Sequence, residues 1–501
     1  MLKTLFICLM PMTMSIAESN YKEPFRPQFH FSPPSGWTND PNGLVYYKGY
    51  WQLFYQYNPD KDGGGLYKYW GHARSKDLFH WENLPPALSP YNNSAGKEVS
   101  IFSGSAIADV NNVTKLTPPG ANTTTLLAFY TAHEVADFHE TQAMAYSYDD
   151  GITWNHFEKN PVIDNPDRLH DFRDPKIFKY NDKYIAVVAT GDHVRFFEST
   201  DLIKWELMST YSNQFSKNDT VWECSDLFKL GDKWVLLVNH NAKAEYFIGD
   251  FDGRNFTSEE PSNETDRLYL DYGPNSYAGI TYESAPDGRR VFLSWLPGFR
   301  PYASLTPTDP WRGSMSVPRE LSLVTLASGR RVVSSQPVKE ISGLYDGPSI
   351  GFQATNMKVN TTLPVWVLTS NLLDLRFTAS GVPSSGRFGI KFAGQTDHIK
   401  IYYEDGNYYI DRGNTISNFS ADYELIMSAP RLRNSPDHNL RIVLDVSSVE
   451  VFIDGGLSVL TAQFFSSQQL SNASLFFESP ESNAKVAKIS FSAYRLRSAW
   501  P

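Results

Sequence analysis

The chain has 501 residues, with 45 lysines and arginines against 55 acidic residues, so its formal net charge is −10. Aromatic side chains make up 14% of it and charged ones only 20%, a composition that can bury large cores and excludes a disordered protein. The acidic balance argues against nucleic acid or an anionic membrane as a partner, because both require a dense positive surface.

The first 17 residues have the features of a secretory signal peptide. Lys3 precedes the apolar stretch Leu5–Met10, and the small-residue pattern Ser15–Ala17 follows, which is typical of a cleavage site. We therefore expect residues 1–17 to be removed and the protein to be secreted. No later segment offers the roughly 18 uninterrupted apolar residues of a transmembrane helix, so no membrane association is expected.

The mature chain is expected to depend on packing rather than on disulfides. Cys8 belongs to the signal peptide, which leaves Cys224 as the single thiol, so no internal disulfide can form. Nine Asn-x-Ser/Thr sequons fit a secreted protein that carries N-glycans. They begin at Asn92, Asn112, Asn122, Asn218, Asn255, Asn263, Asn360, Asn418 and Asn472.

Short runs of aromatic and β-branched residues recur along the chain and predict an all-β protein. Each run has the length of a strand and is bounded by Gly, Asp, Asn or Pro, and no sustained helical periodicity accompanies them. The runs are Tyr50–Tyr55, Leu126–Tyr130, Tyr184–Val188, Trp234–Val238 and Val291–Trp295.

A weak internal repeat, in which an Asp precedes a Trp by four or five residues, occurs at Ser75–Trp81, Ser147–Trp154 and Ser199–Trp205. The pattern suits a hairpin whose turn is tied by the carboxylate and whose Trp packs between sheets. Intervals of 73 and 51 residues between the Trp positions fit propeller blades with insertions. Unrelated hairpins that share Asp and Trp are the alternative.

The pattern changes after Gln336-Pro337 to alternating strands such as His398–Tyr403 and Leu440–Val446. The continuation through Ser448–Gly456 is typical of a hairpin in a two-sheet sandwich. We expect a first domain at residues 18–340, a linker at 341–352 and a β-sandwich domain at 353–501.

Asp40 stands in a turn-forming segment, Asn39–Gly43, just before a strand. Pro, Asn and Gly there would hold the carboxylate rigidly at a strand edge, as a nucleophile requires. The alternative is a carboxylate that caps its own turn.

Asp174 and Glu223 are further candidates. The cations flanking Asp174 are expected to keep it ionised, and an ordinary ion pair is the alternative. Glu223 lies between Trp222 and Cys224, where a partly apolar wall would raise its pKa and suit a general acid. A solvated strand glutamate is the alternative there.

Ten segments in a fixed order carry a resemblance to a known family. They are Trp37–Gly43, Phe54–Pro59, Trp70–His72, Phe102–Ser105, Phe172–Lys176, Trp222–Cys224, Asp271–Gly273 with Tyr277–Ala278, Pro310–Gly313, Val317–Leu321 and Ser447–Phe452. Over about residues 21–496, the chain resembles glycoside hydrolase family 32, the secreted invertases, inulinases and levanases that cleave β-fructofuranosides.

The resemblance implies a five-bladed β-propeller followed by a β-sandwich. It also implies that Asp40 is the nucleophile, that Glu223 is the acid/base, and that Asp174 stabilises the transition state and holds fructose hydroxyls. The positions implied to line the fructose pocket are Asn39, Gln56, Phe102, Ser103 and, beside Asp174, Arg173. No cofactor and no metal are expected, since no His/Cys/Asp cluster has metal-ligand spacing.

The implied function is a secreted retaining β-fructofuranosidase that hydrolyses terminal β-D-fructofuranosyl bonds of sucrose and fructan oligosaccharides through a fructosyl intermediate on Asp40. Retention needs an attacking carboxylate and a protonated one roughly 5 Å apart. The alternatives are a fructosyltransferase, a sialidase-like glycosidase suggested by residues 147–154, and a non-catalytic fructan-binding protein. A homo-oligomer formed through the sandwich is also open.

Three features depart from the family pattern. Thr38 and Ser225 stand where members commonly have Met and Pro. The Gly-rich segment at residues 60–69 stands where many members have a Trp that contacts fructose, and Tyr67 or Tyr69 is the candidate substitute. Trp295 and Tyr302 match positions near the rim of the pocket, although burial within a blade is the more frequent fate of such a Trp.

Overall fold

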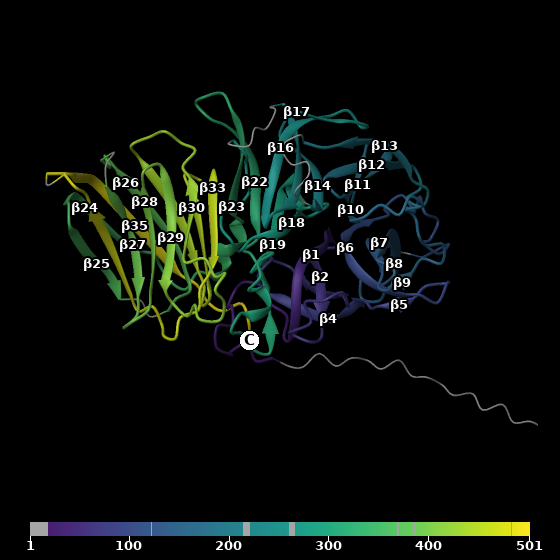
Figure 1. Ribbon diagram of the computed structural model, residues 1–501, viewed down its shortest axis with the longest axis horizontal. Coiled ribbons are helices and arrows are strands. Elements are labelled where there is room, and N and C mark those ends of the chain that lie inside the picture. Colours follow the sequence, from purple (N-terminus) through teal and green to yellow (C-terminus); the bar gives the residue numbers. More distant parts are fainter. Residues whose placement is uncertain are drawn as a thin grey trace, which may run out of the picture.

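The structure, a computed structural model, describes residues 19–121, 123–213, 221–259, 266–367, 370–383, 386–481 and 483–501. The predicted signal peptide and the sequons at Asn122, Asn218 and Asn263 lie outside these residues. Two β bodies stand side by side in Figure 1, one built from the first two thirds of the chain and the other from the last third.

The first body is a β-propeller whose described strands form five sheets. Their first long strands, β1, β6, β10, β14 and β18, contact one another in a ring that closes from β18 back to β1. The short strand β20 pairs with β1 in parallel, so a late segment of the chain completes the first sheet and fixes the closure of the ring.

The bounds of the propeller elements are as follows. The first sheet contains β1 (Gly36–Tyr47), β2 (Tyr50–Asn58), β3 (Tyr69–Ser75), β4 (Trp81–Leu88) and β20 (Trp311–Arg312). The second contains β5 (Tyr91–Asn92), β6 (Glu98–Ala108), β7 (Leu126–Glu134), β8 (His139–Ser147) and β9 (Asn155–His156). The third contains β10 (Phe172–Tyr180), β11 (Lys183–Thr190), β12 (His193–Ser199) and β13 (Glu206–Tyr211).

The fourth sheet contains β14 (Glu223–Leu230), β15 (Lys233–His240), β16 (Lys243–Phe251) and β17 (Phe256–Ser258). The fifth contains β18 (Tyr277–Thr281), β19 (Arg290–Leu296), β21 (Ser314–Met315), β22 (Arg319–Thr325) and β23 (Arg331–Pro337). Three short 3₁₀ helices, η1 (Pro286–Gly288), η2 (Ala303–Leu305) and η3 (Lys339–Leu344), lie between or after its strands.

The five aromatic runs of the sequence are the second long strands of the five sheets, β2, β7, β11, β15 and β19. Their side chains are largely buried on both faces, because each blade packs between two neighbours. The continuous apolar character of the runs follows from this packing, and the all-β prediction is confirmed.

The Asp–Trp repeat marks the turn between the third and fourth strands of three successive blades. Asp77 accepts hydrogen bonds from the backbone N–H groups of Phe79 and His80 at 3.1 and 2.8 Å, and Asp149 and Asp201 tie the corresponding turns. These bonds confirm the predicted role of the carboxylate. In the fourth blade Asp252 ties the same turn, but a Phe follows it in place of Trp, so the sequence pattern missed that turn.

The second body is a sandwich of two six-stranded antiparallel sheets. One contains β24 (Ile350–Lys358), β26 (Leu373–Ser380), β31 (His438–Leu444), β32 (Ser448–Ile453), β33 (Ser458–Gln463) and β35 (Lys485–Arg495). The other contains β25 (Thr361–Val367), β27 (Arg387–Ala393), β28 (His398–Glu404), β29 (Asn407–Asn414), β30 (Ile426–Pro430) and β34 (Asn472–Glu478). The predicted hairpin is the pair β31 and β32.

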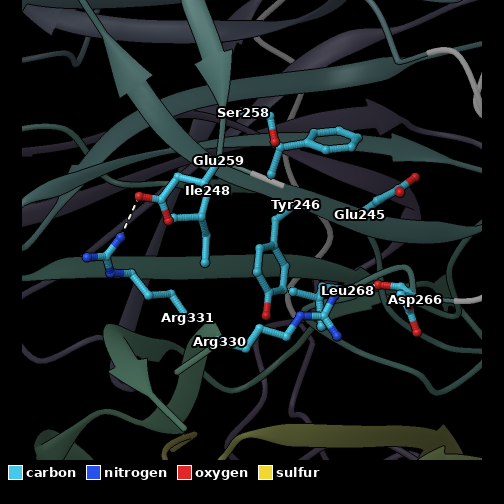
Figure 2. Close-up of a pocket in the computed structure, with 10 residues that line it drawn as sticks. Glu245, Tyr246, Ile248, Ser258, Glu259, Asp266, Leu268, Arg330 and Arg331 are labelled. Atoms are coloured by element: carbon cyan, nitrogen blue, oxygen red, sulfur yellow. Dashed lines mark hydrogen bonds and ion pairs between the residues drawn. The ribbon is translucent and has the colours of Figure 1, made fainter. Parts of the chain in front are cut away.

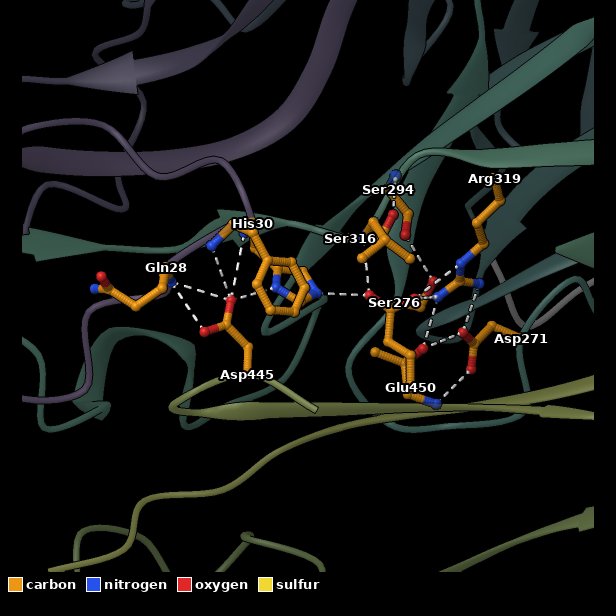
Figure 3. Close-up of polar contacts among 12 residues, drawn as sticks. Gln28, His30, Asp271, Ser276, Ser294, Ser316, Arg319, Asp445 and Glu450 are labelled. Carbon is orange, nitrogen blue, oxygen red and sulfur yellow. Dashed lines mark hydrogen bonds and ion pairs between the residues drawn. The ribbon is translucent and has the colours of Figure 1, made fainter. Parts of the chain in front are cut away.

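A buried polar network joins the sandwich to the propeller (Figure 3). His30 bridges Asp445 and Glu450 of the sandwich at 2.7 and 2.9 Å. Glu450 also accepts hydrogen bonds from Arg319, which reaches Asp271 at 2.8 Å. Each charged side chain of this network therefore has a partner of opposite charge, which offsets the cost of burying it.

Candidate active site

The first long strand of every propeller sheet is interrupted by a β-bulge at the same end of the ring. The pairing register shifts between Thr38 and Pro41, Ile101 and Gly104, Arg173 and Lys176, Glu223 and Asp226, and Tyr277 and Ile280. A bulge turns a side chain out of the regular alternation of a strand. The five bulges therefore direct side chains of five blades toward one place.

Asp40 lies in the bulge of β1 and is held by its neighbours. Asn39 Nδ2 donates a hydrogen bond to Asp40 Oδ1 at 3.0 Å, and Ser103 Oγ donates to Oδ2 at 2.7 Å. The thiol of Cys224 lies 3.6 Å from the same Oδ2. Burial raises the pKa of that thiol well above its usual value, so Cys224 stays protonated and acts as a weak donor.

Asp174 lies in the bulge of β10, where its backbone takes the left-handed conformation with φ 61°. The backbone N–H of Cys224 donates to Asp174 Oδ2 at 2.8 Å, and the N–H of Asp174 donates to Thr131 Oγ1 at 2.8 Å. The first bond, from β14, fixes the carboxyl group, and the second, to β7, fixes the backbone, so three blades hold Asp174 in place. A non-glycine residue at positive φ is uncommon, and such strain clusters at functional sites.

The flanking cations were expected to keep Asp174 ionised, but in the structure the pKa of its carboxyl is raised. Its buried position raises the pKa of the carboxyl to about 8, against the lowering effect of Arg173. Lys176 does not help, because its ammonium turns toward Asp226 and Glu283 at 3.4 and 3.1 Å. Desolvation and the neighbouring acids therefore outweigh the flanking cations, and the pKa of Asp174 lies well above its usual value.

Glu223 begins β14 and faces the same place. Its carboxyl accepts hydrogen bonds from Tyr277 Oη at 2.6 Å and from Arg173 Nη1 at 3.3 Å. Burial raises the pKa of Glu223, although Arg173 and the Tyr277 hydrogen bond lower it. The predicted direction is thus confirmed, but Trp222 is not the wall, since it is buried in a core cluster with Phe196 and Phe247.

The remaining predicted pocket residues join the same network. Gln56 is buried and donates to the carbonyl of Ile101 at 3.0 Å, one residue before Phe102. The ring of Phe102 stacks on His133 with centroids 4.2 Å apart. His133 pairs with Glu140, which also pairs with Arg173. The structure thus connects all eight residues singled out in the sequence.

Several members of this network carried no distinctive signal in the sequence. Tyr277 lies in a segment that resembles the family, but nothing in its spacing marks it as the partner of Glu223. Glu140, His133 and Thr131 stand in ordinary strands. Only the three-dimensional pairing of blades brings them to the acids.

The structure shows where the four aromatic residues considered for the pocket wall and rim lie. Tyr67 is 44% exposed and its hydroxyl contacts Glu98, outside the network, while Tyr69 is half-buried beside Tyr57. Trp295 is buried and packs edge-on against Trp37. Tyr302 is buried against the sandwich. Neither Trp295 nor Tyr302 forms an exposed rim.

No cluster of three or more His, Cys, Asp or Glu side chains able to hold a metal ion occurs in the part of the chain that the structure describes. A separate pocket lies beside β16 and the turn before β23, where Arg331 pairs with Glu259 (Figure 2). None of the eight candidate residues lines it. Ser103, Asp174 and Cys224 instead line one narrow cavity together.

A β-propeller with three carboxyl groups gathered at its central strands defines a propeller glycoside hydrolase. The chain belongs to glycoside hydrolase family 32. Residues 30–336 match the model of the glycosyl hydrolases family 32 N-terminal domain, and residues 340–493 match that of the family 32 C-terminal domain.

Individual relatives agree with this assignment. A levanase of Bacillus subtilis is 36% identical over 99% of this chain and 74% of its own length. The crystal structure of an exo-inulinase from Aspergillus awamori is 30% identical, covers 96% of this chain and 100% of its own, and superposes with a TM-score of 0.85. A fructofuranosidase from Schwanniomyces occidentalis, solved with fructose, is 27% identical, covers 96% of this chain and 100% of its own, and has a TM-score of 0.81.

Proposed function

We propose that this protein is a secreted retaining β-fructofuranosidase that releases terminal β-D-fructosyl units from sucrose and short fructans. The observation that carries the proposal is the contrast between two carboxyl groups in one network. Glu223 is buried with a raised pKa and a phenol donor, Tyr277, whereas Asp40 is fixed in the bulge of β1 by hydrogen bonds that it accepts from Asn39 and Ser103. Such a pair supplies one proton donor and one nucleophile.

In the proposed mechanism, Asp40 attacks the anomeric carbon of the fructosyl group. Glu223 gives its proton to the departing oxygen, which leaves a fructosyl ester on Asp40. Glu223, now ionised, takes a proton from water, and that water opens the ester with net retention. The hydrogen bonds to Asp40 leave the carboxylate one fixed orientation, which favours attack along a single direction.

Asp174 and Arg173 are proposed to hold the fructose hydroxyls. Asp174 is held by hydrogen bonds to two neighbouring blades, and burial raises the pKa of its carboxyl to about 8, so the protonated form can both donate and accept hydrogen bonds. Arg173 is in turn held by Glu140 and Asp171. The pair therefore offers fixed polar groups that need little reorganisation on binding.

The proposed substrates and extracellular location follow the names of relatives, which include an extracellular exo-inulinase of Aspergillus niger. The relatives are named levanase, exo-inulinase and fructofuranosidase, names that point to fructans and β-fructofuranosides as substrates. No helix in the described residues is long and apolar enough to cross a membrane. Five described sequon asparagines are exposed and are proposed to carry N-glycans: Asn92, Asn255, Asn360, Asn418 and Asn472.

Product analysis of the purified protein tests the function. We expect equal glucose and fructose from sucrose at low and high concentration, fructose from inulin and levan, and β-fructofuranose as the first anomer seen by NMR. Excess glucose with new oligosaccharides would assign transfer to an acceptor sugar instead. Absence of release from all three substrates would contradict catalysis and favour the binding protein.

Isosteric variants test the roles of the two acids. Asp40→Asn and Glu223→Gln should each fold and lower kcat by about 10³-fold or more, because covalent and acid–base steps are lost. Asp182→Asn, in the exposed turn before β11, is the matched control and should retain full activity. Turnover within tenfold of wild type in either active-site variant would refute that residue's role.

A further inference from the structure

Lys68 is a buried lysine beside the candidate active site that the mechanism above does not use. Only 6% of its surface is exposed, and lysine is almost never so buried without a charged partner. It lies near the end of the Gly-rich segment at residues 60–69, after its three glycines and directly before β3.

The backbone of Lys68 is fixed against the strand that carries Phe102 and Ser103. Its N–H donates to Ser100 Oγ at 2.7 Å, and its carbonyl accepts from the N–H of Ile101 at 3.0 Å. Lys68 therefore sits between the first two blades, immediately beside the bulge of β6. Its position is set by strand pairing rather than by a free loop.

The ammonium of Lys68 lies over Trp37, with Nζ 5.2 Å from the ring centre. The indole N–H of Trp37 donates to Asn39 at 2.7 Å, and Asn39 donates to Asp40. Burial lowers the pKa of Lys68 to about 8, and the negative charge of Asp40 opposes that lowering. The side chain is thus charged at neutral pH, and its ammonium lies on the ring that is bonded to Asn39 and, through Asn39, to Asp40.

The ammonium is poorly satisfied by the protein. Within the residues that the structure describes, its one hydrogen bond is to the carbonyl of Gly63 at 3.4 Å, and it has no ion pair within 4 Å. An ammonium has three donors, and buried donors without partners are costly. A polar ligand beside Asp40 would satisfy the remaining donors.

The two tyrosines considered as the pocket wall do not take this place. Tyr67 is exposed toward Glu98, and Tyr69 packs near Tyr57. The Gly-rich segment covers Trp37 closely, since a Cβ at Gly64 would lie 3.5 Å from its ring. Among the charged side chains of that segment, Lys68 is the one that is buried.

We propose that Lys68 is a substrate-binding residue that forms this wall of the pocket and donates hydrogen bonds to hydroxyl groups of the fructosyl unit beside Asp40. The inference rests on the proposed function and adds a binding residue to the same site. A cation at this wall selects hydroxyl-bearing rather than apolar groups, so it tightens the binding of fructose itself.

Lys68→Met tests the inference because it keeps the stem that packs on Trp37 and removes the charge. We expect the Kd for free fructose, measured by calorimetry, to rise about 10- to 100-fold, with a matching rise in KM for sucrose and a smaller change in kcat. Lys68→Arg keeps a cationic donor and should recover part of the affinity. The matched control is Lys61→Met, whose lysine in the same segment pairs with Asp309 at 2.6 Å.

The outcomes separate this inference from the proposed function. Wild-type turnover with unchanged fructose affinity in Lys68→Met would overturn the role of Lys68 and leave the function standing. Loss of fructose affinity in Lys68→Met but not in Lys61→Met, at wild-type melting temperature, would support it. A wild type that cleaves none of the substrates but binds fructose through Lys68 would refute the function alone. A wild type that neither cleaves any of the substrates nor binds fructose would refute both proposals.

Discussion

At the scale of single residues, the site depends on how three acids share protons. Burial raises the pKa values of both Asp174 and Glu223, and in each case the charge of Asp40 contributes. Repulsion between neighbouring carboxylates disfavours three charges at once, and this repulsion adds to the effect of burial on the pKa values of Asp174 and Glu223. The titrations are coupled, and a pH profile reports the group of acids rather than one residue.

Tyr277→Phe should move the basic limb of the pH profile upward. The Tyr277 hydroxyl donates to the ionised form of Glu223 and lowers its pKa. Without that bond the pKa of Glu223 rises, so the acid keeps its proton to higher pH. We expect the basic limb of kcat/KM on sucrose to shift upward by about 1 to 2 pH units.

The matched control for this measurement is Tyr67→Phe. Tyr67 donates its hydroxyl to Glu98, away from the three acids, so its pH profile should coincide with that of wild type. A Tyr277→Phe profile that does not move, or that moves to lower pH, would show that Tyr277 does not tune Glu223.

At the scale of elements, the recurring bulge is the feature that builds the site. Each bulge lies in the first long strand of a blade, where five strands meet around the ring. Regular pairing there would turn the side chains back into alternation with the sheet. The same local bulge, repeated in five blades, thus brings different side chains from a symmetric scaffold together at one candidate site.

Gly104→Ala tests the bulge of β6. A Cβ at Gly104 would lie 1.9 Å from the carbonyl oxygen of Phe129 and 2.9 Å from the Cα of Tyr130, so β6 and β7 must separate. We expect unfolding in urea to become easier by about 1–3 kcal/mol and kcat to fall, because Ser103 loses its bond to Asp40. Gly343→Ala, whose Cβ meets nothing within 4 Å, is the control, and equal stability of the two variants would refute the argument.

Strands and turns could be predicted from the sequence because their signals are local. Apolar runs and Asp turns are decided by a few neighbouring residues, as in Tyr184–Val188 and Ser199–Trp205. The raised pKa of Asp174 could not be predicted from the sequence, because it depends on burial by blades far apart in the sequence. The partner of Glu223 and the burial of Lys68 were missed for the same reason.

At the scale of the whole molecule, the sandwich supports the loops that carry the site. Arg412 of the sandwich donates to Asn275 at 2.8 Å, two residues before Tyr277. Glu424 of the sandwich pairs with Arg300, in the loop that packs on the same segment through Pro274. The interface therefore positions the partner of Glu223, and its stability bears on activity.

His30 makes that interface sensitive to alkaline pH. Burial lowers its pKa, but Asp445 and Glu450 outweigh this and raise the pKa from 6.5 to about 9. The raised value means that the folded protein holds the proton more tightly than the unfolded chain. The resulting stabilisation, about 3 kcal/mol, is fully present below pH 6.5 and is lost as pH rises toward 9.

His30→Gln removes this titration and so gives a pH-dependent difference from wild type. In urea unfolding we expect the variant to be less stable at pH 6, and the gap to narrow steadily between pH 6.5 and 9, because wild type loses the contribution that the variant never has. A gap that stays constant over this range would mean that His30 supports the interface by packing alone, since only a proton bound more tightly in the folded state makes the difference depend on pH.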